Sequence, residues 1–247
     1  SSHAQPSVTA AAVAALPVAL HDDSSELTQP LRQYEPLRAC WRQSGAAVPY
    51  RHLAIALTAL ETTRSRLTKE LILTNAFRSM LALGAPADEI EAACYLLAPA
   101  KDAQTGGHRL RPDWAEGGRP LSIPHGSITS AVLEVTGASR ADFRRLYQEL
   151  HEIGEVALAL RERGGRQRLL RPPPPLTAGA VRRKLLGLAD VSGTGAGDAK
   201  TQILVGLLRA ATGAEVKWLV RTFLPHMAAG ISLEASVLPA LGAGAVI

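Results

Sequence analysis

A glycine-rich segment is the part of this sequence whose residue types come closest to a binding site. It spans Val191 to Asp198, with the letters VSGTGAGD, and Lys200 follows it. Glycine leaves backbone N–H groups unshielded, and the start of the helix predicted to follow adds a positive dipole end, so a phosphate oxygen could dock there. A predicted helix, not a strand, precedes the segment and no Gly-Lys-Ser/Thr follows it, which excludes a dinucleotide fingerprint and a Walker loop. An ordinary flexible connection between helices is the competing interpretation.

Positive charge is concentrated in the same part of the chain. The formal net charge is +5, but residues 161–221 hold 12 basic and 4 acidic side chains, which leaves 15 basic and 18 acidic for the rest. This distribution is typical of a surface that faces a polyanion, with a solvated basic face as the alternative. Part of the charge is a cluster of arginines that could track a DNA backbone: Arg161, Arg163, Arg166, Arg168 and Arg171.

The run Pro172 to Pro175 follows this cluster directly. Four consecutive prolines form a stiff, extended segment that cannot enter a helix. A rigid spacer is the simpler interpretation, and a ligand for a proline-recognition module is the alternative.

The residue types that carry catalysis or bind metals show no usable pattern. The seven histidines include no pair at the spacing of a helix-borne metal site, so we expect no metal. Cys40 and Cys94 are far apart, which predicts neither a disulfide framework nor a Cys-rich zinc site and favours a reducing compartment. No serine has the strand-turn-helix context of a nucleophile elbow. The apolar run at residues 10–20 is interrupted by Pro17 and falls short of the ~20 residues that span a bilayer, so we expect no membrane span.

The elements that must position any site are predicted to be helices. Hydrophobic residues make up 47% of the chain and aromatic residues only 4%, which favours a helical core built from Leu, Ala, Val and Ile. Apolar residues recur at helical spacing in a pair of helices over 49–83 and in single helices at 90–97, 127–136, 141–160, 177–189, 198–211, 215–223 and 232–241. Residues 99–126 are predicted to be a long loop, and no segment is a convincing strand.

These elements predict an all-α fold. We expect residues 1–30 to be a disordered tail or linker, because they are rich in Ala, Ser, Pro and acidic side chains. The folded body then covers 31–244, with two lobes at about 31–160 and 172–244 on either side of the proline run.

Several short motifs occur in a fixed order along the chain. They are YEPL at Tyr34–Leu37, Trp41, VPY at Val48–Tyr50, ETTRSRL at Glu61–Leu67, LTNAFR at Leu73–Arg78, CYLL at Cys94–Leu97, GEVA at Gly154–Ala157 and QRLLRPPPPLT at Gln167–Thr177. Lys184, Ala189, Gly193, Lys200, Arg221 and Gly230 follow at matching intervals. Together, over about Tyr34 to Leu241, these patterns resemble the N-terminal DNA-binding domain of eukaryotic-type (DNA ligase I-like) ATP-dependent DNA ligases.

The resemblance implies a fold and a binding mode. In that family the domain is a two-lobed, all-helical module that binds nicked duplex DNA from the minor-groove side through phosphate and sugar contacts, with little base specificity. It implies that three segments face DNA: the turn with Ser65 and Arg66, the loop from Gly193 through Gly195 to Lys200, and the segment from Arg221 through His226 to Gly230. For Arg66 and Arg221, an ion pair at a helix end is the alternative.

Two stretches depart from the family pattern. Where the family usually has Gly-Lys-Leu-Arg-Ile-Gly, this chain has PHMAAG at Pro225–Gly230, so both cations are replaced and only His226 could partly substitute. Where the family has Leu-Gly-Ile-Gly, this chain has LSIP at Leu121–Pro124, after an extended loop over 101–119. Both changes put DNA contacts at these places in doubt.

The resemblance also implies what the chain does not do alone. Ligation in this family begins when a lysine in Lys-x-Asp-Gly attacks ATP, and none of the five lysines here is followed by that pattern. We therefore expect no catalytic residue and no cofactor in this chain, which lacks the adenylation and oligonucleotide-binding (OB) domains. We expect ATP and Mg²⁺ to bind only to the full-length ligase.

The expected partners are nicked double-stranded DNA and those catalytic domains, and we expect no membrane association. By the same resemblance, we expect a monomeric nuclear protein that acts in DNA replication, repair and recombination. The alternative is a stand-alone, non-catalytic DNA-binding or protein-interaction module derived from the same domain.

Overall fold

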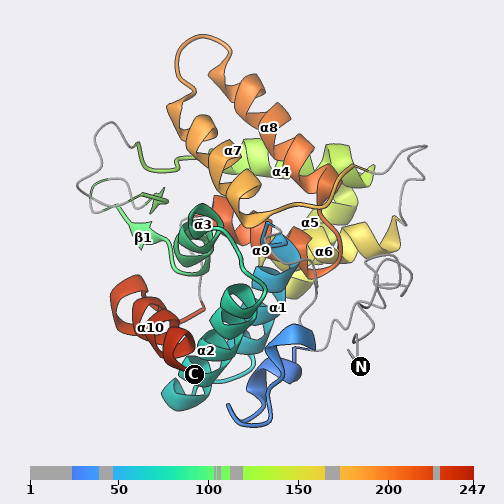
Figure 1. Ribbon diagram of the computed structural model, residues 1–247. Helices are drawn as coiled ribbons and strands as arrows, with labels where there is room; N and C mark the ends of the chain where they lie inside the picture. Colours follow the sequence, from blue (N-terminus) through green and yellow to red (C-terminus); the bar gives the residue numbers. More distant parts are fainter. Residues whose placement is uncertain are drawn as a thin grey trace, which may run out of the picture.

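Helices make up nearly all the regular structure in the computed structural model of the chain (Figure 1). The structure describes residues 24–38, 47–102, 104, 107–111, 119–164, 173–224 and 229–247. Within these ranges the elements are the short turns η2 (Glu26–Thr28) and η3 (Pro36–Arg38), α1 (Tyr50–Glu61), α2 (Arg66–Ala82), α3 (Ala87–Leu97), α4 (His125–Thr136), α5 (Arg140–Leu150), α6 (Ile153–Arg163), α7 (Ala178–Asp190), α8 (Ala196–Ala210), α9 (Ala214–Phe223), the π turn η4 (Leu233–Val237) and α10 (Leu238–Val246). The predicted all-α fold is confirmed.

Helix starts follow from the local sequence at several places. A hydroxyl side chain precedes α2, α5, α7 and η4, and its oxygen accepts a hydrogen bond from the backbone N–H three residues later; these caps are Ser65, Ser139, Thr177 and Ser232. Such a cap satisfies one of the N–H groups that a helix start leaves without a partner. The predicted caps Ser139 and Thr177 are confirmed.

The single helix predicted over 141–160 is wrong, because the structure divides it into α5 and α6. His151 ends α5 in the left-handed region at φ 55°, a conformation that a sequence pattern predicts mainly for glycine. Glu152 then begins α6, where its carboxylate accepts hydrogen bonds from the N–H groups of Gly154 and Glu155 at 2.7 and 2.8 Å. The chain therefore turns between α5 and α6 where a continuous helix was expected.

A small antiparallel hairpin lies within the predicted loop of 99–126. Strand β1 (Ala100–Lys101) pairs with β2 (His108–Arg109), and His108 also forms a bridge with Leu121. The expectation of no strand is wrong to this extent. Hydrophobic periodicity cannot predict strands of two residues, which have no alternation to detect.

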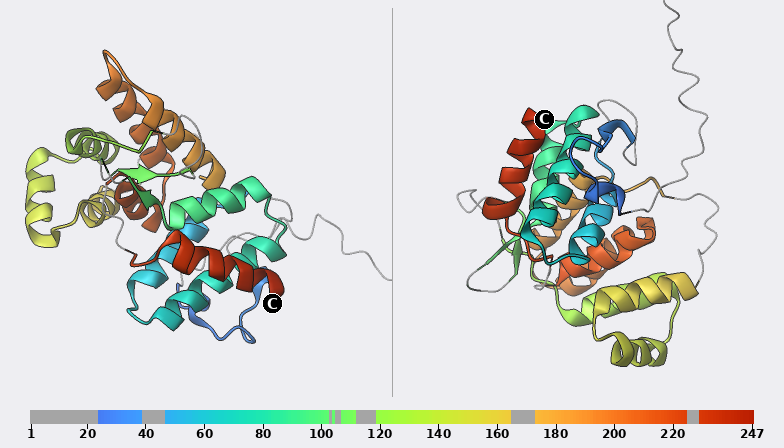
Figure 2. Two further views of the ribbon diagram at one scale, coloured as in Figure 1. Left: turned by 90° about the vertical axis from the view of Figure 1, so that its left-hand side faces the viewer. Right: turned by 90° about the horizontal axis from the view of Figure 1, so that it is seen from below.

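Helices from the two halves of the sequence pack against each other. The most extensive pairings join α2 with α10, α4 with α8, α6 with α9 and α3 with α7, and Figure 2 shows α10 alongside α2. The buried apolar side chains of the described residues form one cluster that draws on all these helices. The lobe boundaries at 31–160 and 172–244 stay a prediction, but the packing crosses them repeatedly.

The folded part begins before residue 31. Leu27 in η2 is buried, and the side-chain amide of Asn75 on α2 donates hydrogen bonds to the carbonyls of Leu27 and Gln29 at 3.1 and 2.8 Å. The end of the predicted tail is therefore part of the domain, while residues 1–23 lie outside the described residues.

Candidate nucleic-acid interface

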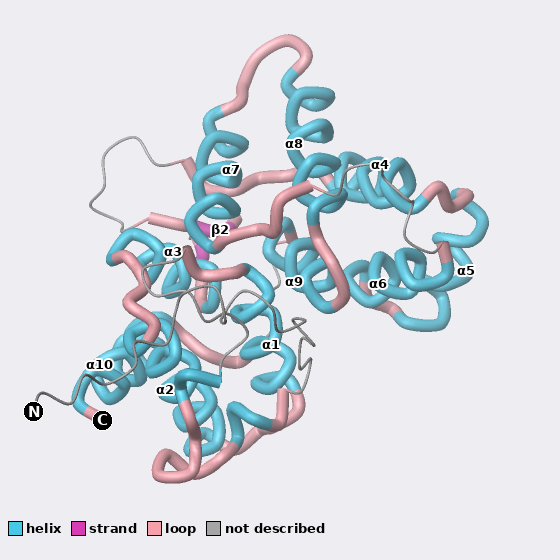
Figure 3. Tube along the Cα trace, turned by 45° about the vertical axis from the view of Figure 1, so that its right-hand side comes forward, coloured by secondary structure: helices cyan, strands magenta, loops and turns pink. Residues whose placement is uncertain are grey.

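The glycine-rich segment forms an exposed turn between α7 and α8. Gly193 and Gly195 have φ angles of 91° and 79°, in the left-handed region that glycine adopts without strain. Gly195 caps α8, which begins at Ala196, two residues earlier than predicted, so Asp198 lies in the first turn of the helix. Figure 3 shows this turn projecting at one end of the molecule, with α2 toward the other end.

Helices α4 and α8 run in the same direction. Near their starts, the Lys200 ammonium donates to the carbonyl of Ser122 at 3.3 Å. Near their ends, the Arg209 guanidinium pairs with the Glu134 carboxylate at 2.9 Å. The two helices therefore run in the same general direction, and the LSIP segment lies beside the second turn of α8.

A second arginine ties the C-terminal ends of the same two helices. The Arg161 guanidinium, at the end of α6, donates to the carbonyl of Val135 in α4 and to that of Arg209 in α8, both at 3.4 Å. A cation at a helix C-terminus interacts favourably with the helix dipole, and here one side chain serves two helices. Arg161 therefore helps to set the alignment of α4 with α8.

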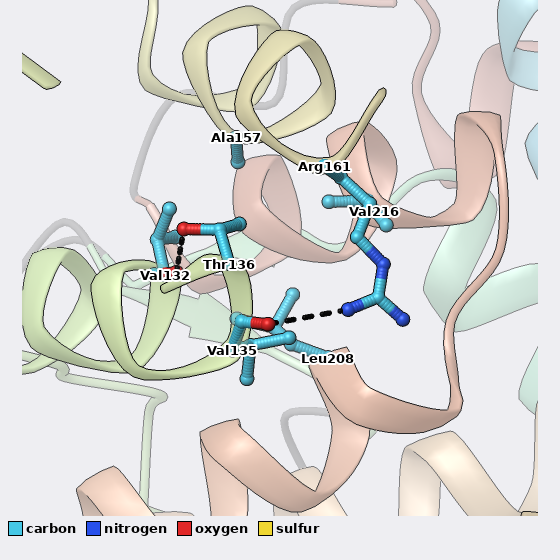
Figure 4. A pocket seen from close by; sticks show the side chains of 7 residues that line it. All are labelled: Val132, Val135, Thr136, Ala157, Arg161, Leu208 and Val216. Carbon is cyan, nitrogen blue, oxygen red and sulfur yellow. Dashed lines mark hydrogen bonds between the residues drawn. The ribbon is translucent and has the colours of Figure 1, made fainter. Parts of the chain in front are cut away.

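The space beneath Arg161 is a narrow apolar crevice, not a ligand site. Figure 4 shows its lining side chains, with the Arg161 guanidinium reaching the Val135 carbonyl: Val132, Val135, Thr136, Ala157, Arg161, Leu208 and Val216. These residues come from α4, α6, α8 and α9, where the four helices meet. A crevice this small and this apolar offers few polar groups to orient a ligand.

The start of α2 forms another exposed basic site. Ser65 and Arg66 are exposed, as is Arg64 before them. One turn into the helix, the Lys69 ammonium donates to the carbonyls of Ala229 and Gly230 at 2.7 and 3.3 Å. Two of the three segments predicted to face DNA, the turn at 65–66 and the end of the segment at 221–230, therefore meet here.

Arg221 is placed differently from the other predicted contacts. Its side chain is 11% exposed, and its guanidinium lies 2.7 Å from Glu61, 3.2 Å from Glu152 and 3.8 Å from Glu155. The ion pair considered as an alternative for Arg221 is thus present, although the structure places it among three carboxylates on two other helices. Arg221 as a DNA contact stays a prediction.

The electrostatics of this region are dominated by the paired charges. Burial opposes ionisation of the Glu61 carboxyl, but hydrogen bonds from Lys217 and Arg221 outweigh it and hold its pKa below the usual value. Glu61 is therefore a stable anion at neutral pH.

Some predicted site residues lie outside the described residues. These are His226 with its neighbours Pro225, Met227 and Ala228, and the arginines Arg166, Arg168 and Arg171 of the basic cluster. Of the remaining candidates, Gly193, Gly195 and Lys200 form one exposed region and Ser65, Arg66 and Gly230 form a second.

Several basic residues have tertiary roles that the sequence did not predict. Among them are Lys69, Arg161 and Lys217, each of which contacts a segment far away in the chain, and Arg161 was considered only as part of the arginine cluster that could track a DNA backbone. Lys69 could have been found, because it lies four residues after Ser65 and such pairs share one face of a helix. For Arg161 and Lys217 no sequence signal identifies the partner.

Metal and membrane sites find no support in the part of the chain that is described. No group of three or more His, Cys, Asp or Glu side chains there could hold a metal ion. Cys94 is buried, and burial raises the pKa of its thiol to about 11, so this thiol stays protonated at neutral pH. No helix among these residues is both long and apolar enough to cross a bilayer.

The comparison with known proteins agrees with this helical architecture. Residues 49–242 match the family model described as DNA ligase N terminus, and the chain therefore belongs to the family of DNA ligase N-terminal domains. The resemblance stated from the motifs is confirmed.

Individual relatives are DNA ligases by name. The chain is 33% identical to DNA ligase 6 of Arabidopsis thaliana over 226 residues, which is 91% of this chain and 15% of that protein. It is 28% identical to DNA ligase 1 of Dictyostelium discoideum over 87% of this chain and 17% of that protein. A DNA ligase of Pyrobaculum calidifontis is 29% identical over 73% of this chain and 28% of that protein. The chain thus spans less than a third of the length of each of these relatives.

Proposed function

We propose that this chain is the DNA-binding part of a DNA ligase, which holds nicked duplex DNA through minor-groove and backbone contacts during nick sealing. The observation that carries the proposal is the exposed glycine-rich turn at the start of α8, where a helix N-terminus and the peptide groups of Gly193 and Gly195 face outward and Lys200 follows one turn further along. Helix N-termini and glycine N–H groups bind phosphate oxygens, and a lysine adds charge that carries no sequence preference.

The second exposed region supports contacts at another place on the same duplex. Arg64 and Arg66 stand at the start of α2, and Lys69 holds Gly230 next to them. Because the two regions belong to different parts of the molecule, we propose that they contact separate stretches of the sugar-phosphate backbone. Binding of this kind reads the shape and charge of a duplex more than its bases.

The catalytic steps are assigned to the rest of the parent ligase. The chain has no Lys-x-Asp-Gly, and its described residues hold no acidic cluster for a metal ion, which supports placing ATP and Mg²⁺ elsewhere in the ligase. We propose that the adenylation and OB domains bind both, that the domain presents the nick to them, and that the ligase acts in the nucleus in replication, repair and recombination.

A non-catalytic binding module is the second candidate. It is favoured by PHMAAG at Pro225–Gly230, where the family usually carries two cations. The coding sequence beyond Ile247 distinguishes the candidates, since a downstream Lys-x-Asp-Gly supports the ligase and a stop codon supports the module.

A binding titration tests DNA binding itself. We expect the 247-residue chain to bind fluorescent nicked duplex with similar affinity for unrelated sequences, and the logarithm of the association constant to fall linearly with that of the salt concentration, by about 0.9 for each phosphate neutralised. Lys200→Gln should weaken binding and reduce this slope by about 0.9, whereas Arg145→Gln, an equal loss of charge on α5, should change neither. Absent binding, or binding that ignores salt, would overturn the proposal.

A further inference from the structure

Five charged side chains from three helices meet where α1, α6 and α9 pack together. The Lys217 ammonium lies 2.5 Å from carboxylate oxygens of both Glu61 and Glu155, and its side chain is 9% exposed. Arg221, one turn further along α9, contacts the same two glutamates and Glu152. We refer to Glu61, Glu152, Glu155, Lys217 and Arg221 as the junction cluster.

The junction cluster is attached directly to the turn between α1 and α2. Glu61 is the last residue of α1, and four residues later Ser65 caps α2. Two cations on α9 therefore hold the end of α1, while Glu152 and Glu155 connect them to the start of α6. The placement of the exposed arginines in the turn depends on this end of α1.

An aromatic side chain reinforces the same junction. The Trp218 indole N–H donates to the Thr58 hydroxyl of α1 at 2.9 Å. The Arg221 guanidinium lies 4.6 Å from the centre of the Trp218 ring, a distance at which a cation is attracted to the ring face. Helix α9 is thus joined to α1 by a hydrogen bond and by charge, and within α9 the Arg221 guanidinium also packs on the Trp218 ring.

We propose that Glu61, held by Lys217 and Arg221, is a positioning residue that fixes the α1–α2 turn for DNA binding, and that Arg221 acts through Glu61 and not through a phosphate. This inference rests on the proposed function. The guanidinium donates hydrogen bonds to two carboxylates and lies 3.8 Å from a third, so negative charge already surrounds it. An arginine that neutralises a phosphate would also have to withdraw from Glu152 and leave Glu61 and Glu155 with Lys217 alone, which weakens the contacts that hold the end of α1.

Glu61→Gln tests the proposal by the sign of its effect. Removing a negative charge from a DNA-binding protein should tighten binding if charge alone matters. If Glu61 positions the turn, the same substitution weakens the contacts of Lys217 and Arg221 with the end of α1. The dissociation constant for nicked duplex should then rise by about fivefold at a temperature where the variant is fully folded. Glu149→Gln, which removes an equal charge from exposed α5, serves as the matched control and should leave affinity unchanged or slightly tighter.

The salt dependence of binding tests the role of Arg221. Arg221→Gln should weaken binding while leaving the salt slope as in the wild type, because no phosphate contact is lost, and Arg221→Lys should restore part of the affinity. A slope smaller by about 0.9 in Arg221→Gln would assign the arginine to a phosphate and overturn the proposal. If Arg221→Gln does not fold, as judged by circular dichroism, Glu61→Gln decides alone, because glutamine keeps the side-chain shape and one of the two acceptor oxygens that Lys217 and Arg221 use.

The outcomes separate this inference from the proposed function. Wild-type protein that fails to bind nicked duplex refutes the proposed function. Wild-type protein that binds, together with Glu61→Gln that binds equally well or more tightly, refutes only the positioning role.

Discussion

Gly195 gives a test in which one backbone angle sets the result. The residue caps α8 with φ at 79°, and a Cβ added there would meet no atom within 4 Å. Gly195→Ala therefore introduces no collision with neighbouring groups. Only the strain of a side chain in the left-handed region remains, so the substitution measures that strain directly.

The expected magnitude follows from this geometry. Alanine in the left-handed region is about 1–2 kcal/mol less stable than in its preferred conformations. In a chain of this size, 1 kcal/mol corresponds to roughly 2–4 °C in the melting temperature, so Gly195→Ala should lower it by roughly 2–8 °C. Because the glycine N–H groups would also move, we expect weaker binding of nicked duplex.

Gly197 provides a matched control two residues away. It lies in the first turn of α8, without a left-handed φ, and an added Cβ there also meets no atom within 4 Å. Alanine is the better helix former, so Gly197→Ala should raise stability by up to about 1 kcal/mol. Thermal and urea unfolding of both variants measure the difference. Equal stability of the two variants, or a Gly195→Ala protein as stable as the wild type, would refute the reasoning.

Three further predictions concern the DNA surface, helix alignment and acid stability. Arg66→Ala should weaken binding of unrelated nicked duplexes to a similar extent, and a loss confined to one sequence in the titration would contradict it. Arg161→Met should lower the free energy of unfolding in urea by about 1–2 kcal/mol, because the guanidinium bonds to the ends of two helices, and an unchanged unfolding midpoint would contradict that role. Burial lowers the pKa of His52 from 6.5 to about 4, against an opposing effect of its hydrogen bond to the Ala76 carbonyl. The unfolded chain then binds a proton that the folded chain does not, so stability should be complete above pH 6.5 and fall by up to about 3 kcal/mol as the pH drops toward 4. His52→Gln should lack this part of the pH dependence, and parallel profiles of the two proteins would contradict it.

Much of the helical order could be predicted from local sequence. The hydroxyl caps Ser139 and Thr177 and the apolar spacing of the neighbouring helices are local signals, and the structure has helices there. The break at His151 could not be predicted in the same way, because a non-glycine residue in the left-handed region depends on how α5 and α6 pack. Local signals thus indicate most helices but not every place where a helix stops.

The candidate surface was predictable as separate segments and not as an arrangement. The sequence singled out the start of α2, the glycine-rich turn and Gly230, but not the Lys69 contact that joins two of them or the Lys200 contact with Ser122. The surroundings of Arg221 could not be predicted either, because its match to the family pattern gives no information about the glutamates that contact it. Contacts between distant segments depend on tertiary packing, which a single sequence does not encode in any local pattern.

The pairing of α2 with α10 has a consequence for how the protein folds as it is made. Helix α2 ends at Ala82 and α10 begins at Leu238, yet the two approach so closely that a Cβ at Gly244 would lie 3.3 Å from the Cβ of Phe77. At ordinary rates of translation, α2 leaves the ribosome on the order of ten seconds before its partner has been synthesised. Until then the apolar side chains of α2 that α10 covers can be bound by chaperones or by other nascent chains. Packing of α10 against α2 then buries them.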